Sequence, residues 1–426
     1  MNHSKALFFG LLCLLLGILT GCHHNDEPDP TPSTKSGTRT VLVYMVADNT
    51  LYGFSGDDIN EMKTGFASMG IDVSKCNLLI YMDPIPNDKD PLDRLPTIYR
   101  LVKDASGNVT DEIFYEYPAN HDSASPTVIQ DVITKVRTAY SAEKYGFIYW
   151  SHGEGWVSYP TPTKSLKPMA GMEQKWIGVD DNPKLSHTEI SDLRKALAIG
   201  FGQRVDFLMF DACFMLTVET VYELREVADY VVSSPTEIPG PGAPYDVIVP
   251  KMFGGNAAQG IVQSYYNYYG ATYDETKSNL NKPWTGGVSI GAAKTSAMEN
   301  LAKITKSMLG KHQAFDLHTL KDSVLNYDRR SETSSSYIGY YDLYGVMERL
   351  LSAPDFNNWK AAYDAAVVSF LTTPKNFSAS AGLFSMEGSK GLSVYLPVTE
   401  DGTSPRDVAY QNTAWYKDAG LSQLGW

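Results

Sequence analysis

The sequence predicts an α/β fold, with a mostly parallel central sheet sandwiched by helices and a smaller C-terminal region. The first observation is a set of near-continuous apolar runs of strand length, which are typical of strands covered on both faces. The second is that helical patterns lie between these runs, and this alternation favours a parallel sheet. The chain has 426 residues, 43% of them hydrophobic and 20% charged, so it can bury a substantial core.

Five apolar runs predict the strands of this sheet. They cover residues 40–47, 77–82, 145–151, 205–210 and 229–234.

Helical patterns separate several of these strands. Pro126 stands at the first turn of one predicted helix. Ser186 and Glu189 have the spacing of a capping box before the next one. Residues 216–228 also have helical spacing. This last pattern begins so soon after the fourth strand that we expect a helix directly behind Cys213.

The second half of the chain is less regular. The tyrosine-rich stretch 263–273 fits a helix face packed on the core, and 286–304 fits a strand, a turn and a helix. Residues 391–397 form a late strand that ends at a proline. We therefore expect a main domain over residues 39–300 and a C-terminal helical region over 301–426, whose late strand completes the fold.

The N-terminal residues predict a targeting segment. A basic start at Lys5 is followed by an apolar run up to residue 21. The run ends in LTGC, which resembles the bacterial lipoprotein box, where the cysteine (here Cys22) is lipidated and becomes the new N-terminus. We expect a signal peptide over 1–21, then a flexible tether over 22–38 that is rich in Pro and acids. The expected location is the cell envelope, anchored by lipid to the outer membrane or the cell surface. The alternative is an ordinary cleaved signal peptide.

Composition narrows the possible partners. The formal net charge of -13 argues against nucleic acid, because phosphate binding requires a basic face. An acidic surface attracts basic peptides instead. Four cysteines are present, and two of them, Cys13 and Cys22, fall in the N-terminal segment. Cys76 and Cys213 remain, so the folded part has at most one disulfide: either the two pair, or each stays a thiol. The sequence contains no Gly-Lys-Ser/Thr phosphate loop, and we expect no cofactor to be required for chemistry.

Two predicted strand ends carry reactive side chains. The third strand leads into His152 and Gly153 within YWSHGEGW, and the fourth leads into Asp211 and Cys213 within MFDACFM. Functional groups gather beyond the carboxyl ends of strands in open parallel sheets. We therefore expect His152 and Cys213 to lie near each other at the rim of the sheet.

This pair of residue types suits nucleophilic catalysis. A thiol attacks carbonyls only as thiolate, so its ordinary pKa of about 8.5 must fall. A helix N-terminus behind Cys213 and an imidazole nearby would both favour the thiolate, and His152 can protonate a departing amine. Gly153 lets the backbone approach a substrate carbonyl, and its N–H can bind the oxyanion. Removing one such donor typically costs ~100-fold or more in rate.

These motifs together resemble the clostripain family of cysteine peptidases, within the caspase-like clan. The resemblance is carried by YWSHGEGW, MFDACFM, VYELREVADYVVSSPTEIPGPGAPYD and GLSVYLP, in this order, between residues 40 and 397. It implies a caspase-like fold and an endopeptidase that cleaves after Arg or Lys through a Cys–His dyad and an acyl-enzyme. Cys213 matches the family nucleophile and His152 the family histidine.

The resemblance implies further roles. Asp211 matches an acidic residue associated with the pocket for the basic side chain; its structural alternative is a carboxylate that caps the following helix. Glu154 and Glu237 are weaker candidates for lining the cleft. Several family members are precursors that are cut between the histidine and the cysteine. Lys164 and Lys167 lie in that segment and are candidate sites of self-processing.

Calcium dependence also occurs in the family. The oxygen-rich stretch VDDN at 179–182 is the candidate for a calcium ligand set, although two adjacent acids alone are a poor signature. The identity of any metal ligands therefore stays open.

Two rival interpretations come from the same sequence. GVSIG matches the nucleophile elbow of serine hydrolases, with Ser289 as nucleophile and His312 or His318 as its partner. The second rival is a surface binding protein built on a peptidase fold that has lost activity. Against this second rival, both His152 and Cys213 are present in suitable surroundings.

Overall fold

The computed structural model describes residues 37–70, 75–87, 89, 94–157, 177–277, 279–334 and 336–426. All of these belong to one compact unit. The predicted signal peptide, the lipidation site Cys22 and most of the tether lie outside the described residues, as do Lys164 and Lys167.

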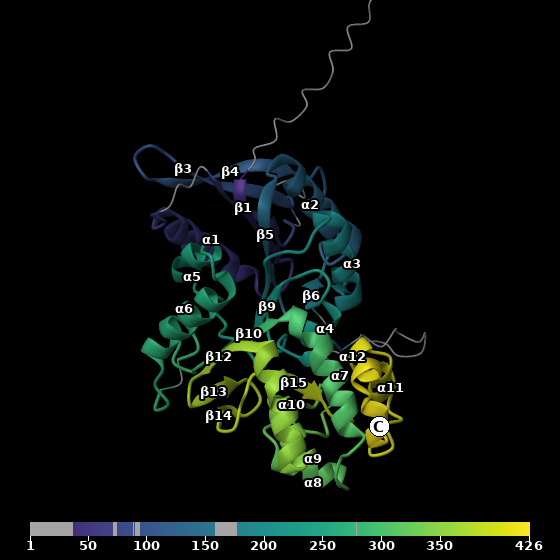
Figure 1. Ribbon diagram of the computed structural model, residues 1–426. Helices are drawn as coiled ribbons and strands as arrows, with labels where there is room; N and C mark the ends of the chain where they lie inside the picture. Colours follow the sequence, from purple (N-terminus) through teal and green to yellow (C-terminus); the bar gives the residue numbers. More distant parts are fainter. Residues whose placement is uncertain are drawn as a thin grey trace, which may run out of the picture. The chain divides into compact units, whose positions relative to one another are not determined.

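A nine-stranded sheet forms the centre of this unit (Figure 1). In spatial order its strands are β12 (Val367–Thr372), β10 (Ser289–Lys294), β9 (Tyr230–Ser233), β8 (Phe207–Asp211), β5 (Ala142–Trp150), β1 (Gly37–Val46), β2 (Cys76–Asp83), β3 (Thr97–Lys103) and β4 (Val109–Glu116).

The five middle strands, β9-β8-β5-β1-β2, are parallel to one another. They coincide with the five apolar runs of the sequence, which confirms the predicted α/β fold class. Both edges of the sheet are antiparallel: β3 and β4 extend it beyond β2, and β10 and β12 extend it beyond β9. The parallel character therefore holds for the centre of the sheet, where the candidate site residues follow their strands.

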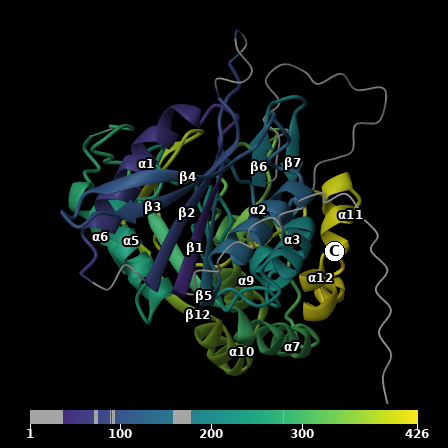
Figure 2. The same cartoon turned by 90° about the horizontal axis from the view of Figure 1, so that it is seen from above.

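Alternate residues of β1 enter two separate cores, as a strand of period two requires. Val41, Val43 and Met45 belong to one core, together with residues of α1, α5 and α6. Leu42 and Tyr44 belong to the other core, together with residues of α2, α3 and α7. Figure 2 shows α1, α5 and α6 on one side of the sheet and α2 and α3 on the other. The near-continuous apolar character of the strands reflects this burial on both faces.

Twelve α-helices occur in the described part of the chain. Their bounds are α1 Tyr52–Ala67, α2 Pro126–Ala139, α3 Ile190–Phe201, α4 Val218–Glu223, α5 Tyr245–Met252, α6 Ala257–Thr272, α7 Met298–Leu309, α8 Leu317–Ser323, α9 Leu343–Leu350, α10 Ala353–Ala366, α11 Pro405–Gln411 and α12 Ala414–Ala419. None of the helices within these described residues is both long and apolar enough to cross a membrane.

Three two-stranded sheets complete the described structure. They are β6 (Ile177–Asp180) with β7 (Ser186–Thr188), β11 (Tyr340–Asp342) with β15 (Ser393–Tyr395), and β13 (Lys375–Ser378) with β14 (Gly382–Ser385).

The region after residue 300 is continuous with the rest. α7 runs across that position, and β12 forms one edge of the central sheet. The late strand of the sequence is β15, which pairs with β11. Ser393 also donates its backbone N–H to Leu216 O, 3.1 Å away, just beyond β8. The C-terminal region thus supports the chain that follows the main strands.

The predicted capping box at Ser186 is wrong. Ser186 lies in β7, where its hydroxyl donates to Asp122. The N-cap of α3 is Glu189, and its side chain makes no capping hydrogen bond in the described structure. The three residues from Ser186 pair with β6 instead, so the short sheet satisfies their backbone groups before the helix begins.

Candidate active site

The pairing of β5 with β8 brings the two reactive strand ends together. Trp150 is in register with Asp211, and the next N–H, of Ser151, donates to Asp211 O at 3.4 Å. His152 and Cys213 each follow this matched pair by two residues. Because the two strands are parallel, both residues leave the sheet at the same edge.

Gly153 shows how closely the two strand ends approach. A Cβ at this position would lie 2.8 Å from Ala212 Cβ and 2.9 Å from Cys213 O. Both distances are shorter than real Cβ contacts allow, so any larger residue would push the histidine segment away from the cysteine segment. The structure therefore brings the segment of His152 and Gly153 close to the segment of Asp211 and Cys213.

Two neighbouring segments hold His152. Its ring Nε2 lies 2.8 Å from the hydroxyl of Thr50, which follows β1. Its backbone carbonyl accepts from Gly178 N–H at 3.0 Å, so β6 supports the same residue from a second direction. The residue is half-buried. The orientation of the imidazole thus depends on the chain just beyond β1 and on β6.

The expected helix directly behind Cys213 is absent from the described structure. Phe214 has φ +58, in the left-handed region that a non-glycine residue rarely adopts. Its N–H donates to Thr236 O, and Leu216 N–H donates to Ser234 O, each at 3.0 Å. The chain therefore turns at Cys213 and Phe214 and is held beside the segment after β9, and α4 begins only at Val218. No helix N-terminus directly follows Cys213 in the described chain, contrary to the sequence-based expectation.

The surroundings of Cys213 disfavour its thiolate. Burial is the main cause that raises the pKa of the Cys213 thiol, to about 12, and the negative charge of Glu237 adds to it. The Ile238 N–H, 3.4 Å from Sγ, and the positive charge of Arg330 act in the opposite direction. The thiol is thus neutral at physiological pH in this state of the chain.

Asp211 lies in the interior and forms a pair with Asp58. Its Oδ2 accepts from Ala243 N–H at 3.1 Å and from the Tyr245 hydroxyl at 2.9 Å, while its buried Oδ1 has no hydrogen-bond partner among the described residues. Burial raises the pKa of Asp211 to about 6. It raises the pKa of Asp58 to about 9, with Asp211 as the second cause. Asp211 does not cap α4, whose N-cap is Thr217, so the helix-capping alternative is wrong.

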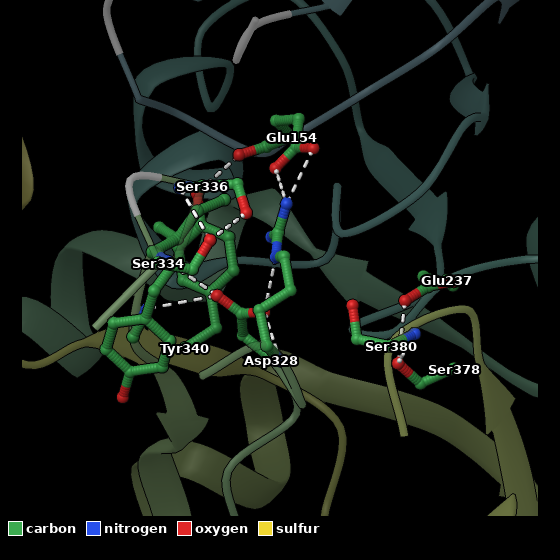
Figure 3. A network of polar contacts seen from close by, with 12 residues as sticks. Glu154, Glu237, Asp328, Ser334, Ser336, Tyr340, Ser378 and Ser380 are labelled. Atoms are coloured by element: carbon green, nitrogen blue, oxygen red, sulfur yellow. Dashed lines mark hydrogen bonds and ion pairs between the residues drawn. The ribbon is translucent and has the colours of Figure 1, made fainter. Parts of the chain in front are cut away.

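Two polar networks, drawn in Figure 3, contain charged groups that act on Cys213. Glu154 accepts both its carboxylate hydrogen bonds from Arg330 Nη1, at 2.9 Å each, and Arg330 Nε donates to Asp328 at 2.6 Å. In the second network, Glu237 accepts from the Ser378 hydroxyl at 2.9 Å and from Ala379 N–H at 2.8 Å.

The acids of these two networks have different hydrogen-bond partners. The Arg330 guanidinium compensates two acids, and its pKa rises because Glu154 and Asp328 favour the charged form over the opposing effect of burial. Burial raises the pKa of Glu237, whose hydrogen bonds come from neutral groups. The negative charge of Glu237 therefore acts on Cys213 more strongly than that of Glu154.

The serine-hydrolase interpretation is wrong. Ser289 opens β10 and is 2% exposed, so it lies at the start of a strand and not on a strand-to-helix turn. Its hydroxyl lies 3.0 Å from that of Ser234 and 2.8 Å from that of Thr236. Of the two histidines considered, His312 is bound to Leu309 O at 2.7 Å and His318 is paired with Asp322 at 3.2 Å.

The two remaining cysteines occupy unlike positions. Cys76 is buried in β2, where it behaves as a small apolar residue, and Cys213 is half-buried at the candidate site. No disulfide joins the two, both of which lie in the described part of the chain. The open choice between a pair and two thiols is thus decided for two thiols.

Thr50 was not among the residues predicted from the sequence. It follows β1 in the stretch Asp48-Asn49-Thr50, where a buried strand ends in three polar residues. The same strand-end pattern that identified His152 and Cys213 is therefore present at β1 and, with Asp83, at β2. Applying it to all the parallel strands would have found these residues.

Comparison with known proteins agrees with this geometry. The model of the clostripain family matches residues 43–424. Clostripain from Hathewaya histolytica is 26% identical over 448 residues, covering 91% of this chain and 80% of that protein.

Two solved structures give the same result. The first is a secreted C11 cysteine protease from Bacteroides thetaiotaomicron in complex with an irreversible peptide inhibitor; it is 35% identical with a TM-score of 0.78, covering 91% of this chain and 99% of that one. The second, an inactive zymogen C11 protease from Parabacteroides distasonis, is 26% identical with a TM-score of 0.70, covering 90% and 98%. The resemblance seen in the sequence is confirmed, and the chain is a cysteine endopeptidase of the clostripain family.

Proposed function

We propose that this endopeptidase cleaves after Arg or Lys, with Cys213 as nucleophile and His152 as general acid and base. The observation that carries the proposal is the register of β5 and β8, in which both residues follow a matched pair at the same edge of the sheet. The approach of Gly153 to the Cys213 carbonyl group supports it, because the two segments are in van der Waals contact.

The reaction proceeds in two stages. His152 accepts the proton of the Cys213 thiol as sulfur attacks the scissile carbonyl carbon, and the carbonyl π electrons move to oxygen. When the tetrahedral intermediate collapses, His152 donates that proton to the departing amine and a thioester remains. Water then attacks the thioester and gives its proton to His152, which returns it to the leaving sulfur. The products are a carboxylic acid, an amine and the original thiol.

Two features assist the charges that develop in this reaction. The Gly153 N–H is the proposed donor to the oxyanion, because glycine has no side chain of its own between this backbone and a substrate carbonyl. Thr50 is a positioning residue, since its hydroxyl is bound to His152 Nε2 and limits rotation of the ring. A donor to the oxyanion acts only in the transition state, so its loss should lower kcat more than it changes KM.

The proposed preference for a basic side chain follows from the acids around Cys213. The buried Oδ1 of Asp211 lacks a hydrogen-bond partner within the described residues, and the Asp211 charge raises the pKa of the neighbouring Asp58. A guanidinium or ammonium group would relieve both conditions, because it supplies donors and positive charge. Glu237 adds a second acid whose charge acts on Cys213, and its hydrogen bonds come from neutral groups. We assign Asp211 and Glu237 to substrate binding.

We further propose that the uncut chain is a precursor. The neutral thiol of Cys213 and the absence of a helix dipole behind it both oppose attack on a peptide bond. Lys164 and Lys167 lie between His152 and Cys213 in the sequence, where an enzyme specific for basic residues could cut its own chain. A relative with 26% identity is described as an inactive zymogen, which supports this interpretation.

The proposed location is the bacterial cell envelope. The apolar run ending in LTGC supports lipidation at Cys22, and dual or triple acylation anchors a protein far more firmly than one chain does. Protein and peptide substrates with basic residues would then be cut at the membrane surface.

The test is a panel of fluorogenic peptides that differ only at P1, with Arg, Lys, Leu and Asp compared. The chain, once cut between His152 and Cys213, should cleave the Arg and Lys peptides. The Cys213→Ala variant should cleave none, and Cys76→Ala should match the parent because Cys76 lies in the core of β2. Cleavage by Cys213→Ala at the parental rate would refute the mechanism. Equal rates for Leu and Lys would refute the specificity alone.

A further inference from the structure

Three buried aspartates meet at the carboxyl ends of β1, β2 and β6. Asp48 directly follows Ala47 at the end of β1, Asp83 is the last residue of β2, and Asp180 is the last residue of β6. Their exposed fractions are 1%, 0% and 0%. One carboxylate oxygen of each lies within 4.8 Å of the others. Three acids in such proximity repel one another strongly in the interior.

The hydrogen bonds of this cluster are incomplete. Asp180 is satisfied: its Oδ2 accepts from the N–H and hydroxyl of Ser123, and its Oδ1 accepts from Asn182 N–H at 3.0 Å. Asp48 accepts from the Asn182 amide through Oδ1 only, at 2.9 Å. Asp48 Oδ2 and both oxygens of Asp83 are buried and accept no hydrogen bond from the described residues. Buried carboxylate oxygens without partners are costly, so these three oxygens point to a missing positive group.

We propose that Asp48, Asp83 and Asp180 bind a calcium ion. The donors are all carboxylate oxygens, with no histidine or cysteine in the cluster, which suits a hard cation and not zinc. Calcium binds oxygens at roughly 2.3–2.6 Å, so two oxygens on opposite sides of the ion lie up to about 5 Å apart. Magnesium needs about 2.0–2.1 Å and retains several waters, which a fully buried cluster accommodates poorly.

The stretch at 179–182 contributes less to this site than its composition suggests. Asp180 is a proposed ligand, whereas Asp181 is exposed and lies outside the cluster. The other two ligands come from strands that are far away in the sequence, so no local motif could reveal them. Calcium sites built on one loop have such a motif, and this one does not.

The proposed ion would be connected to the active site through two short segments. Thr50, whose hydroxyl is bound to His152, follows Asp48 by two residues. Gly178, whose N–H is bound to the His152 carbonyl oxygen, precedes Asp180 by two residues.

Asn49 joins these two segments. Its side-chain amide donates to Val46 O at 2.8 Å and to Val179 O at 2.7 Å. An ion that fixes Asp48 and Asp180 would therefore fix both supports of His152. This functional part of the inference rests on the proposed role of His152, while binding of the ion does not.

The experiment measures binding directly on the full chain with Cys213→Ala, which excludes self-cleavage. Calcium chloride and magnesium chloride are each titrated into chelator-treated protein by calorimetry, and the melting temperature is recorded in parallel. We compare the Cys213→Ala parent with Asp83→Asn and with a matched control, Asp181→Asn, which makes the same chemical change at an exposed neighbour.

The parent and the Asp181→Asn control should bind calcium and melt at a higher temperature with it. Partners outside the ligand shell contribute roughly 10–100-fold to metal affinity, so Asp83→Asn should weaken calcium binding by at least ~100-fold. Without calcium, Asp83→Asn should melt no lower than the parent, because it removes one of three repelling charges. The melting temperature without calcium thereby shows whether this variant binds calcium weakly because it is misfolded or because it has lost a metal ligand.

Three results would overturn the assignment: no binding by the parent, equal binding by Asp83→Asn, or magnesium binding as tight as that of calcium. Because none of these readouts uses peptidase activity, they are independent of the proposed substrate and mechanism. In the active chain with intact Cys213, chelation should lower kcat by more than it raises KM, since it would loosen His152 and leave the substrate acids in place. An unchanged kcat would overturn the link to His152 and leave the ion site standing.

Discussion

The thiol of Cys213 should be unusually inert in the uncut chain. Its pKa is raised from 9 to about 12, so at about pH 8 the thiolate fraction should be ~1000-fold lower than that of an ordinary thiol. The residue is only half-buried, and solvent screens part of the effect, so we expect a deficit of at least ~100-fold. Since iodoacetamide reacts with the thiolate, the rate of alkylation reports this fraction directly.

The assay follows alkylation of the Cys213 peptide by mass spectrometry from about pH 6 to pH 10, with the denatured chain as reference. The rate in the folded chain should rise about tenfold per pH unit over the whole range. The denatured reference should level off near its ordinary pKa of about 8.5. A folded chain that levels off there too would refute the reasoning, because its thiol would then be unperturbed.

A substitution separates the two causes of this effect. Glu237→Gln removes the charge that is the second largest cause of the raised pKa of Cys213, so alkylation at about pH 8 should become faster. Glutamine can still accept from Ala379 N–H and can donate to Ser378, so the local bonds persist. Glu226→Gln is the matched control, because Glu226 has a side chain that is 63% exposed. Equal acceleration in both variants would show a general charge effect in place of a local one.

Three further predictions concern stability and activity. Glu219 is 3% exposed, and burial raises its pKa from about 4.5 to about 7, so its ionisation lowers the stability of the fold as the pH rises through this range. The Glu219→Gln variant should therefore have a free energy of unfolding up to ~3 kcal/mol higher than the parent at about pH 8, and an equal one below about pH 4. Urea denaturation at both pH values measures this difference. Gly153→Ala should lower kcat/KM by at least ~100-fold, since its methyl group would lie 2.8 Å from Ala212 Cβ; activity near the parental value would contradict the close approach. Arg330→Met should destabilise the fold by about 3–5 kcal/mol because two buried acids lose their counter-charge. Adding Glu154→Gln to this variant should recover part of the lost stability. Additive effects of the two changes on the free energy of unfolding would argue against a shared network.

The central strands could be predicted because their signal is local. β1, β2, β5, β8 and β9 are buried on both faces, so each appears in the sequence as a continuous apolar run. The edge strands could not be found in this way. β4 has one face and most of its residues in solvent, and β12 is half-buried along its whole length. Their sequences therefore lack the apolar pattern on which the prediction depends.

The candidate site divides in a similar way. His152 and Cys213 could be predicted because each directly follows an apolar strand. The two strands are parallel neighbours, so both residues leave the sheet at the same edge. The path after Cys213 could not be predicted, because it depends on hydrogen bonds to Ser234 and Thr236, beyond another strand. Arg330 was also missed, since only the tertiary fold brings it to Glu154. Contacts between distant segments have no signature in either one alone.

The hydrogen-bonded ladder between β5 and β8 has a consequence for any cut in the segment that connects them. Five residue pairs, from Gly146 with Phe207 to Trp150 with Asp211, join the two strands without relying on that connection. Severing the backbone between Val157 and Ile177 would therefore yield two polypeptides that stay associated and migrate separately only under denaturing conditions. The spacing of the two reactive groups is then a property of the sheet, and the linker can vary in length or be lost without altering it.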